Sequence, residues 1–196
     1  MAAKSPIVLI LGAGSNIGQA VARTFASEGY KVALAARSLN EADSTNDHLN
    51  IASDFSTSDD VVNAFSKVEE VFGIPSVAIY NVSAVTFTHA DDPFAISLAD
   101  FSRDTTINIH SAFGVGKSGA AHMIWAASAA YQDRGYKFYY ADDRKADGSP
   151  KYRVSGPAHA DLYLELAQGK TQGPWMQTFV QGVGYTKFDS QYAPLT

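Results

Sequence analysis

The sequence contains no cysteine. This absence excludes disulfides, zinc sites built on thiolates and a cysteine nucleophile. Long apolar runs are missing as well: the apolar stretch that begins at residue 7 leads almost at once into a glycine turn. Because a membrane span or a signal peptide needs a longer run, we expect neither, and we expect a cytoplasmic protein.

Blocks of like charge are also absent, and the net charge is -5. A solvated acidic surface does not attract nucleic acid or an anionic membrane, so we expect neither as a partner. The histidines show no metal-ligand spacing, so we expect no metal site. Hydrophobic residues make up 46% of the 196 residues, enough for one core, which predicts a single domain over residues 1–196.

The first part of the chain alternates between strand and helix patterns. Apolar runs predict strands, whereas apolar residues at helical spacing predict helices after the first and third of these runs. The predicted strands are residues 7–11, 31–36, 49–53 and 76–80, and the predicted helices are residues 17–28 and 58–72. Gly29 is placed to end the first helix and Ser58 to cap the second. This alternation predicts a parallel sheet with right-handed crossovers.

After the fourth predicted strand the alternation stops. Residues 98–112 and 117–133 both have helical patterns, and no strand pattern lies between them. Further along, residues 136–141 and 176–180 predict strands, and residues 158–167 predict a helix. Two consecutive helices without a strand predict a break near Gly114 or Gly116, and a sheet that lacks one central member unless residues 136–141 fill the place.

A glycine motif, Gly12-x-Gly14-x-x-x-Gly18, follows the first strand and opens the first helix. Glycine permits a tight turn and leaves room for a pyrophosphate, and a helix N-terminus offers free N–H groups to that phosphate. The motif and the residues inside it, Ser15, Asn16 and Ile17, therefore predict a dinucleotide site. The alternative is a structural turn without a ligand.

Arg37 stands at the end of the second strand, about 20 residues after the last glycine of the motif, where NAD-binding sheets usually carry an acidic residue. An arginine favours a 2′-phosphate, and Ser38 can add a hydrogen bond. The pair predicts NADP(H) rather than NAD(H). The alternative is a solvated surface arginine.

These motifs resemble the short-chain dehydrogenase/reductase family. "GAGSNIG" is similar to its cofactor loop, Asp54-Phe55 to the pair that contacts adenine, and Asn81 in "YNVSAV" to the asparagine after its fourth strand. "TTINIHSAF", with Asn108, resembles the helix that carries its catalytic asparagine. "GVGKSGAAHM", with Lys117, resembles the next helix. The segments 135–150 and 173–188 resemble a divergent fungal branch. The resemblance implies a Rossmann-like doubly wound α/β sheet, here incomplete.

The resemblance also implies a mechanism for reducing a carbonyl or oxidising an alcohol. In the family a tyrosine transfers the proton, a lysine lowers its pKa, a serine orients the carbonyl and an asparagine holds a water. Here Phe113 occupies the tyrosine position four residues before Lys117. The serine would follow a fifth strand, and about thirty residues, one strand with its connections, are missing between Asn108 and Lys117.

The residues leave several alternatives open. Asp54 and Asn81 could be plain turn or cap residues, and Asn108 and Lys117 could be exposed helix residues. The protein as a whole is a reductase with impaired catalysis, a dinucleotide-binding or regulatory protein without chemistry, or a shortened product without function. A substitute proton donor would have to be sought among Tyr80, Tyr139 and Tyr140. Because the two adjoining helices usually form the family dimer interface, that interface is in doubt, and lost core cover predicts lower stability.

Overall fold

The computed structural model describes residues 5–88, 92, 95–111 and 121–188. Its larger sheet consists of β1 (Ile7–Leu11), β2 (Lys31–Ala36), β3 (His48–Ala52) and β4 (Val77–Tyr80). All pairs are parallel, in the order β3-β2-β1-β4. β1 is fully buried, because it has neighbours on both edges and helices on both faces. The predicted parallel arrangement is confirmed.

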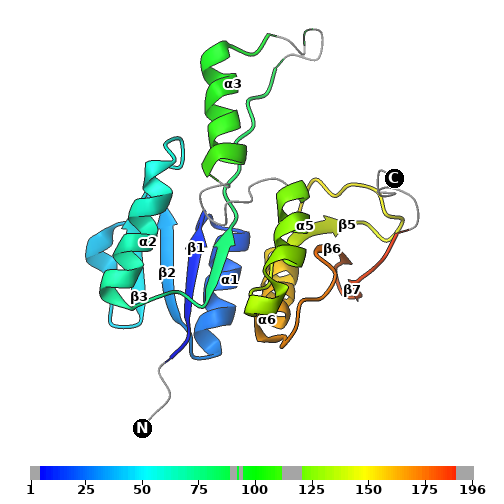
Figure 1. The fold of residues 1–196 in the computed structure, drawn as a ribbon. Coiled ribbons are helices and arrows are strands. Elements are labelled where there is room, and N and C mark those ends of the chain that lie inside the picture. Colours follow the sequence, from blue (N-terminus) through cyan, green and yellow to red (C-terminus); the bar gives the residue numbers. More distant parts are fainter. Residues whose placement is uncertain (1–4, 89–91, 93–94, 112–120, 189–196) are drawn as a thin grey trace.

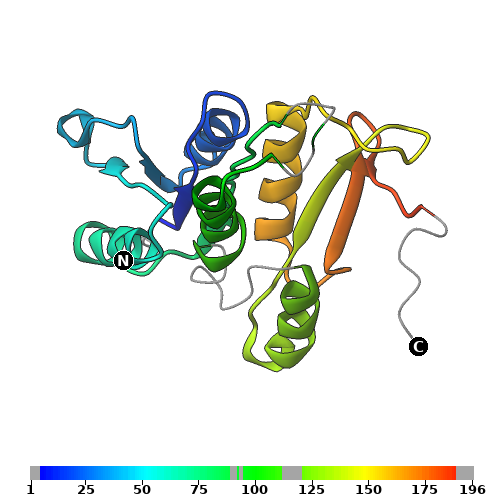
Figure 2. The same cartoon turned by 90° about the horizontal axis from the view of Figure 1, so that it is seen from above.

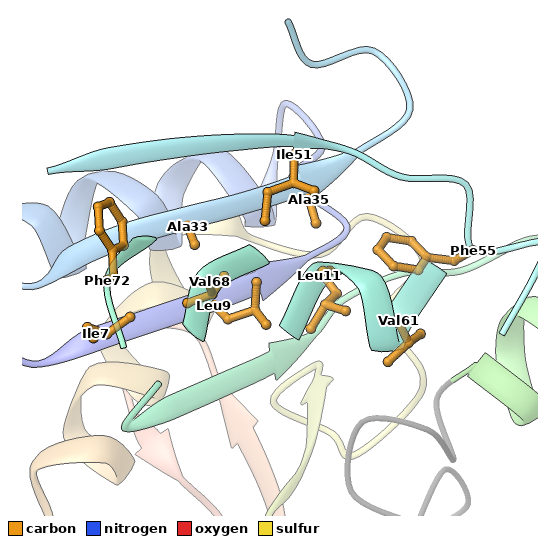
Figure 3. Close-up of a cluster of buried hydrophobic side chains, with 11 residues drawn as sticks. Ile7, Leu9, Leu11, Ala33, Ala35, Ile51, Phe55, Val61, Val68 and Phe72 are labelled. Carbon is orange, nitrogen blue, oxygen red and sulfur yellow. The ribbon is translucent and has the colours of Figure 1, made fainter. Parts of the chain in front are cut away.

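Two helices cover the faces of this sheet, and β1 shows why. Ile7, Leu9 and Leu11 point to the face covered by α2 (Asp59–Val71), where they meet Val61 and Val68 (Figure 3). The alternate β1 residues pack instead with α1 (Ile17–Ser27), as expected for a strand period of two. The β1 sequence is apolar throughout because both of its faces lie in a core.

The helix ends agree with the sequence in one case and differ in another. Gly29 follows α1 with a φ of 80°, the left-handed conformation expected of a glycine that ends a helix. Ser58 occupies the N-cap of α2, but its side chain makes no capping hydrogen bond, so that prediction is wrong. Its backbone is already helical (φ -68°, ψ -24°), and Asp59 and Asp60 place negative charge in the first turn instead. A short 3-10 helix, η1 (Glu41–Asp43), fills the polar segment before β3.

The second half of the chain forms a separate, smaller sheet. β5 (Tyr140–Arg144) pairs parallel to β6 (Met176–Val180), and β7 (Gly184–Tyr185) pairs antiparallel to β6. The helix before β5 is α5 (Ala121–Ala130), followed by the 3-10 turn η3 (Gln132–Arg134), and α6 (Gly156–Gln168) connects β5 to β6. β5 therefore does not fill the place beside β4. Figure 2 shows α6 between the larger sheet and the β5–β6 pair.

α6 joins the two sheets through contacts on both sides. Ala160 belongs to the buried cluster behind β1 and β2, while the ring of His159 lies 4.9 Å from that of Phe179 on β6. The doubly wound, incomplete α/β architecture is thus confirmed. Instead of one continuous sheet, the described chain forms two sheets, and both pack against α6.

α3 (Leu98–Thr105) projects away from the sheet and continues into the π-helix η2 (Thr106–Ser111) (Figure 1). None of the α3 residues is buried: Leu98 is 79% exposed and Phe101 is 55% exposed. Ala78 of β4 is also exposed. Phe113, Gly114, Gly116 and Lys117, and with them the predicted break, lie outside the described residues. No described helix is long and apolar enough to cross a membrane.

Candidate functional site

A cavity of about 490 Å³ lies at the carboxyl ends of the strands of the larger sheet. Six of the residues predicted from the sequence line it together: Gly12, Gly14, Arg37, Asp54, Phe55 and Asn81. The switch in strand order, where β1 has β2 on one side and β4 on the other, is where doubly wound sheets bind ligands. Ser15, Asn16, Ile17, Gly18 and Ser38 are not among the lining residues that the structure describes.

The three glycines of the motif have different surroundings. A Cβ on Gly12 would lie 2.7 Å from the backbone of Asn81, and its φ is 91°. A Cβ on Gly18 would lie 2.6 Å from the Cα of Ala13. A Cβ on Gly14 would meet nothing within 4 Å. Gly12 and Gly18 are therefore required by the fold, whereas the protein itself gives no reason for glycine at position 14.

The N-terminus of α1 faces the same loop. The first N–H groups of a helix have no partner inside the helix, and they carry the positive end of its dipole. Ser15 and Asn16 precede the helix and are exposed. The Gly14 N–H donates to the Gly12 carbonyl at 2.9 Å, so the loop can present N–H groups to an anion from Ser15 onward.

Asn16 has a second role that the sequence did not reveal. Its side-chain Nδ2 donates to the Val154 carbonyl at 3.0 Å, and its Oδ1 accepts from the Gly156 N–H at 3.1 Å. A Cβ on Gly156 would lie 2.7 Å from the Asn16 carbonyl oxygen. The start of α6 is thereby fixed against the glycine loop. The only signal for such a close approach was the small residue Gly156 at the start of the helix.

Arg37 and Asp54 both line the cavity, just after the ends of β2 and β3. Arg37 is exposed and makes no hydrogen bond or ion pair with a described residue. The pKa of Asp54 is lowered, first because its carboxylate accepts from the Ser56 N–H at 3.0 Å, and further because the Arg37 guanidinium is near. The Asp54 carboxylate thus stabilises a tight turn, and the Arg37 guanidinium has hydrogen-bond donors left for a ligand.

Asn81 and Phe55 connect the cavity to the core. The Asn81 Nδ2 donates to the Gly12 carbonyl at 3.1 Å, and its backbone N–H donates to Leu11 at 2.8 Å. Phe55 is buried, and its ring packs edge-on against Tyr80 at 6.2 Å. Both residues shape the cavity wall while also stabilising the fold.

Asn108 lies in the π-helix η2, not on the cavity wall. Its Oδ1 accepts from the Ala84 N–H at 3.0 Å, and its Nδ2 donates to the Ala84 carbonyl at 2.7 Å. A π-helical turn often marks a functional site, yet here both amide groups are engaged by one backbone position. The catalytic role of Asn108 stays a prediction.

η2 and α3 contribute two wall residues that the sequence did not indicate, Ile107 and Arg103. The guanidinium of Arg103 pairs with Asp100 at 2.9 Å and with Asp104 at 3.1 Å. The acidic residues three before and one after Arg103 were the available signal for this pairing.

None of the three tyrosines considered as substitute proton donors is among the described wall residues of this cavity. The Tyr80 hydroxyl donates to the Ile107 carbonyl at 2.5 Å, and burial raises its pKa to about 12. The Tyr139 hydroxyl donates to the Thr171 carbonyl, and Tyr140 lies on β5. The described residues contain no cluster of three metal-ligating side chains. Phe113 and Lys117 lie outside the described residues.

Comparison with known proteins adds sequence and fold relatives. A family model for short chain dehydrogenases matches residues 6–131. The chain is 40% identical to short chain dehydrogenase/reductase dmxR12 of Cryptosporiopsis sp. (strain 8999), over 236 aligned residues that cover 94% of this chain and 95% of that protein. Because the alignment is longer than the 196 residues of this chain, at least 40 of its positions have no counterpart here.

Solved structures show the same fold. A short chain dehydrogenase from Mycobacterium thermoresistibile superposes with a TM-score of 0.71 at 16% identity, over 89% of this chain and 84% of that one. A metagenomic short-chain oxidoreductase, solved in complex with NADP, superposes with a TM-score of 0.66 at 16% identity, over 89% of this chain and 96% of that one. The chain belongs to the short-chain dehydrogenase/reductase family.

Proposed function

We propose that this protein binds NADP(H) in the cavity above β1 and β2, as an oxidoreductase of its family whose carbonyl reduction is impaired. The observation that carries the proposal is the open space at Gly14. Glycine there is not explained by any contact within the protein. It is explained by a pyrophosphate that must approach the backbone closely.

The residues around the cavity fit the two ends of such a cofactor. The N-terminus of α1, with Ser15, Asn16, Ile17 and Gly18, would hold the pyrophosphate through backbone N–H groups. Arg37, with Ser38 beside it, would hold the 2′-phosphate, since its guanidinium is exposed and makes no hydrogen bond or ion pair with a described residue. The structural relative from a metagenome was solved with NADP, which supports the same choice. A bound NADPH would supply the hydride.

Proton transfer is the step for which the described chain is poorly equipped. The Tyr80 hydroxyl is committed to the Ile107 carbonyl, and its pKa of about 12 makes it a weak acid near neutral pH. The Asn108 amide is committed to Ala84. Lys117 remains the candidate for the family's lysine, which by resemblance also holds the cofactor ribose. We therefore expect a small carbonyl or alcohol substrate to react slowly. Separately, we expect the protein to be cytoplasmic.

The engaged amide of Asn108 favours a second candidate function, a dinucleotide-binding protein without chemistry. In that case NADP(H) would serve as a ligand that reports the redox state. The two candidates share the cofactor site and differ only in turnover, so binding and activity must be measured separately.

Binding is tested by calorimetric titration of NADPH and NADH into the wild type and Arg37→Asp. A charge-assisted contact contributes about 1.5–3 kcal/mol, so we expect the wild type to bind NADPH about tenfold or more tightly than NADH. Arg37→Asp should remove this preference. Tighter NADH binding by the wild type would contradict the proposal.

Activity is tested by NADPH oxidation against a panel of aldehydes, ketones and quinones. Positioned acid catalysis typically contributes about 10²–10⁴-fold, so the wild type should turn over at most slowly. Lys117→Ala and Phe113→Tyr are measured alongside. Fast turnover that is insensitive to Lys117→Ala would refute impaired catalysis, and rescue by Phe113→Tyr would show that the catalytic positions are still assembled.

A further inference from the structure

α3 has no buried residue, so it is not held by an apolar core. A helix of its eight residues is not stable alone in water, where about 12 residues or more are needed. Figure 1 shows that the chain leaving β4 runs alongside α3. Polar contacts with this segment, residues 82–86, stabilise the helix instead.

Side chains of α3 and η2 hold the backbone of this segment. The Asp104 Oδ2 accepts from the Thr86 N–H at 2.7 Å. Four residues later, the Asn108 Oδ1 accepts from the Ala84 N–H at 3.0 Å, and its Nδ2 donates to the Ala84 carbonyl at 2.7 Å. The Arg103 guanidinium also donates to the Thr86 hydroxyl at 2.7 Å. Three of these four bonds go to the backbone, so they fix the path of the segment.

The spacing of these bonds requires an extended segment. Four residues of a helix rise about 6 Å, and two residues of an extended chain span about 6.6 Å, so the two sets of groups match. Exposure also alternates, as expected for an extended chain: residues 83, 85 and 87 are exposed, whereas residues 84 and 86 are partly buried. The helix therefore keeps this part of the chain straight.

The same segment forms a wall of the cavity at the glycine loop, which residues 82–85 all line. Successive peptide groups of an extended chain point to opposite sides, so those of Ser83 and Val85 point away from α3. Their N–H and C=O groups make no hydrogen bond with a described residue. They are therefore available to a molecule in the cavity.

We propose that Asp104 is a positioning residue of the NADP(H) site. Together with Asn108 it holds residues 84–86 extended, so that this wall is formed before the cofactor enters. The inference rests on the proposed cofactor site. A wall that is ordered in only a fraction of the molecules lowers the apparent affinity by that fraction. Because Asp104 is not among the described wall residues, its effect must pass through the segment that it holds.

Asp104→Leu tests this role, because leucine has a similar volume and no hydrogen-bond acceptor. Loss of a hydrogen bond to a charged acceptor should weaken NADPH binding about tenfold in calorimetric titration. Asp104→Asn keeps one oxygen for the Thr86 N–H and should restore most of the affinity. If Asp104→Leu binds NADPH as the wild type does, the positioning role is refuted. If the wild type itself does not bind NADPH, the proposed function fails.

The matched control is Asp100→Leu, on the same helix. The Asp100 carboxylate pairs with Arg103 at 2.9 Å, but it makes no bond with residues 82–86. The Ser97 hydroxyl still accepts from the N–H of residue 100, so the start of α3 stays capped. We expect NADPH affinity to be unchanged. An equal loss of affinity in both leucine variants would overturn the proposal, because it would show a general effect of α3.

Thr86→Pro breaks the same bond from the other side, since proline has no N–H and fits an extended chain. It should weaken NADPH binding about as much as Asp104→Leu, and the double variant should lose no more than either single one. Additive losses would mean that the two residues act separately, which contradicts the proposal. Thr86→Pro also provides the test if Asp104→Leu does not fold by circular dichroism.

Amide hydrogen exchange, followed by NMR without cofactor, tests the contact independently of the cofactor site. The Thr86 N–H should exchange about tenfold faster in Asp104→Leu than in the wild type, and at the wild-type rate in Asp100→Leu. Unchanged exchange at Thr86 in Asp104→Leu would show that Asp104 does not hold the segment, whatever the affinity for NADPH, and would overturn the inference.

Discussion

Replacing Gly14 by valine separates ligand binding from folding at the glycine loop. In the protein alone a Cβ at position 14 meets nothing within 4 Å. Surface substitutions without such contacts usually change stability by about 0.5 kcal/mol or less. We therefore expect Gly14→Val to fold with nearly the stability of the wild type. The new side chain would occupy the space in front of the helix N-terminus, where we place the pyrophosphate.

Gly18→Val is the matched control, because it introduces the same side chain four residues later. Its Cβ would lie 2.6 Å from the Ala13 Cα and 2.8 Å from the Gly12 carbonyl oxygen. Backbone atoms cannot move aside cheaply, so overpacking should cost about 1–3 kcal/mol or more. Gly18→Val should therefore be clearly less stable than Gly14→Val, whereas a motif of equivalent glycines would predict equal losses.

Urea denaturation measures the free energy of unfolding, and calorimetry with NADPH measures affinity. Loss of even one charge-assisted hydrogen bond is worth about 1.5–3 kcal/mol, so Gly14→Val should weaken NADPH binding about tenfold or more. A folded Gly14→Val variant that binds NADPH as the wild type does would refute the phosphate site. A strongly destabilised Gly14→Val variant would refute the structural argument instead.

Three further outcomes are expected. Asn108→Ala removes two hydrogen bonds and should lower the free energy of unfolding by about 1–3 kcal/mol in urea denaturation; an unchanged value would mean that these bonds do not persist in solution. Burial raises the pKa of Tyr80 and of Tyr163 to about 12 from 10, so their contribution to stability is complete below about pH 10 and is lost as the pH rises toward 12. Denaturation between pH 9 and 12 should show this loss, and it should shrink in the double phenylalanine variant. Lys151→Met leaves the buried Asp143 carboxylate without its cation at 3.0 Å and should cost about 3 kcal/mol, whereas a melting temperature equal to that of the wild type would show that the pair contributes little.

The larger sheet could be predicted from the sequence because its signals are local. Strands with both faces buried are apolar throughout, and amphipathic helices separate them. β1 and β2 have the predicted bounds. The second sheet was harder to place. The aromatic-rich residues 136–139 precede β5, and the Phe138 backbone pairs with the Gln172 side chain instead of with a strand.

β5 contains charged residues that sequence patterns exclude from a strand interior. Arg144 pairs with Asp142 at 2.5 Å, and Asp143 pairs with Lys151. Burial of a charge is tolerated when a partner and hydrogen bonds compensate it, and those partners are set by the tertiary fold. Asp143 also accepts from the Ser155 N–H at 3.1 Å, just before α6. No sequence pattern within residues 140–144 predicts these ion pairs and hydrogen bonds.

In the candidate site, too, some features could be predicted from the sequence and others could not. Gly12, Gly14, Arg37, Asp54, Phe55 and Asn81 were brought together as predicted, because strand ends of a parallel sheet meet at one edge. The functions of the individual glycines could not be predicted, since they depend on which backbone lies opposite. The role of Asn108 was equally inaccessible, because Ala84 becomes its partner only in the folded chain.

The contact between Asn16 and α6 adds to the packing that holds together the two sheets, which no described strand joins. Two hydrogen bonds from the Asn16 side chain hold the start of α6, and Ser155 at that start is bound to Asp143 of β5. The glycine loop is therefore linked through α6 to the second sheet. A ligand that orders this loop orders the anchor of α6 as well. Because a ligand that binds only the folded state stabilises that state, a bound cofactor would stabilise both sheets through α6.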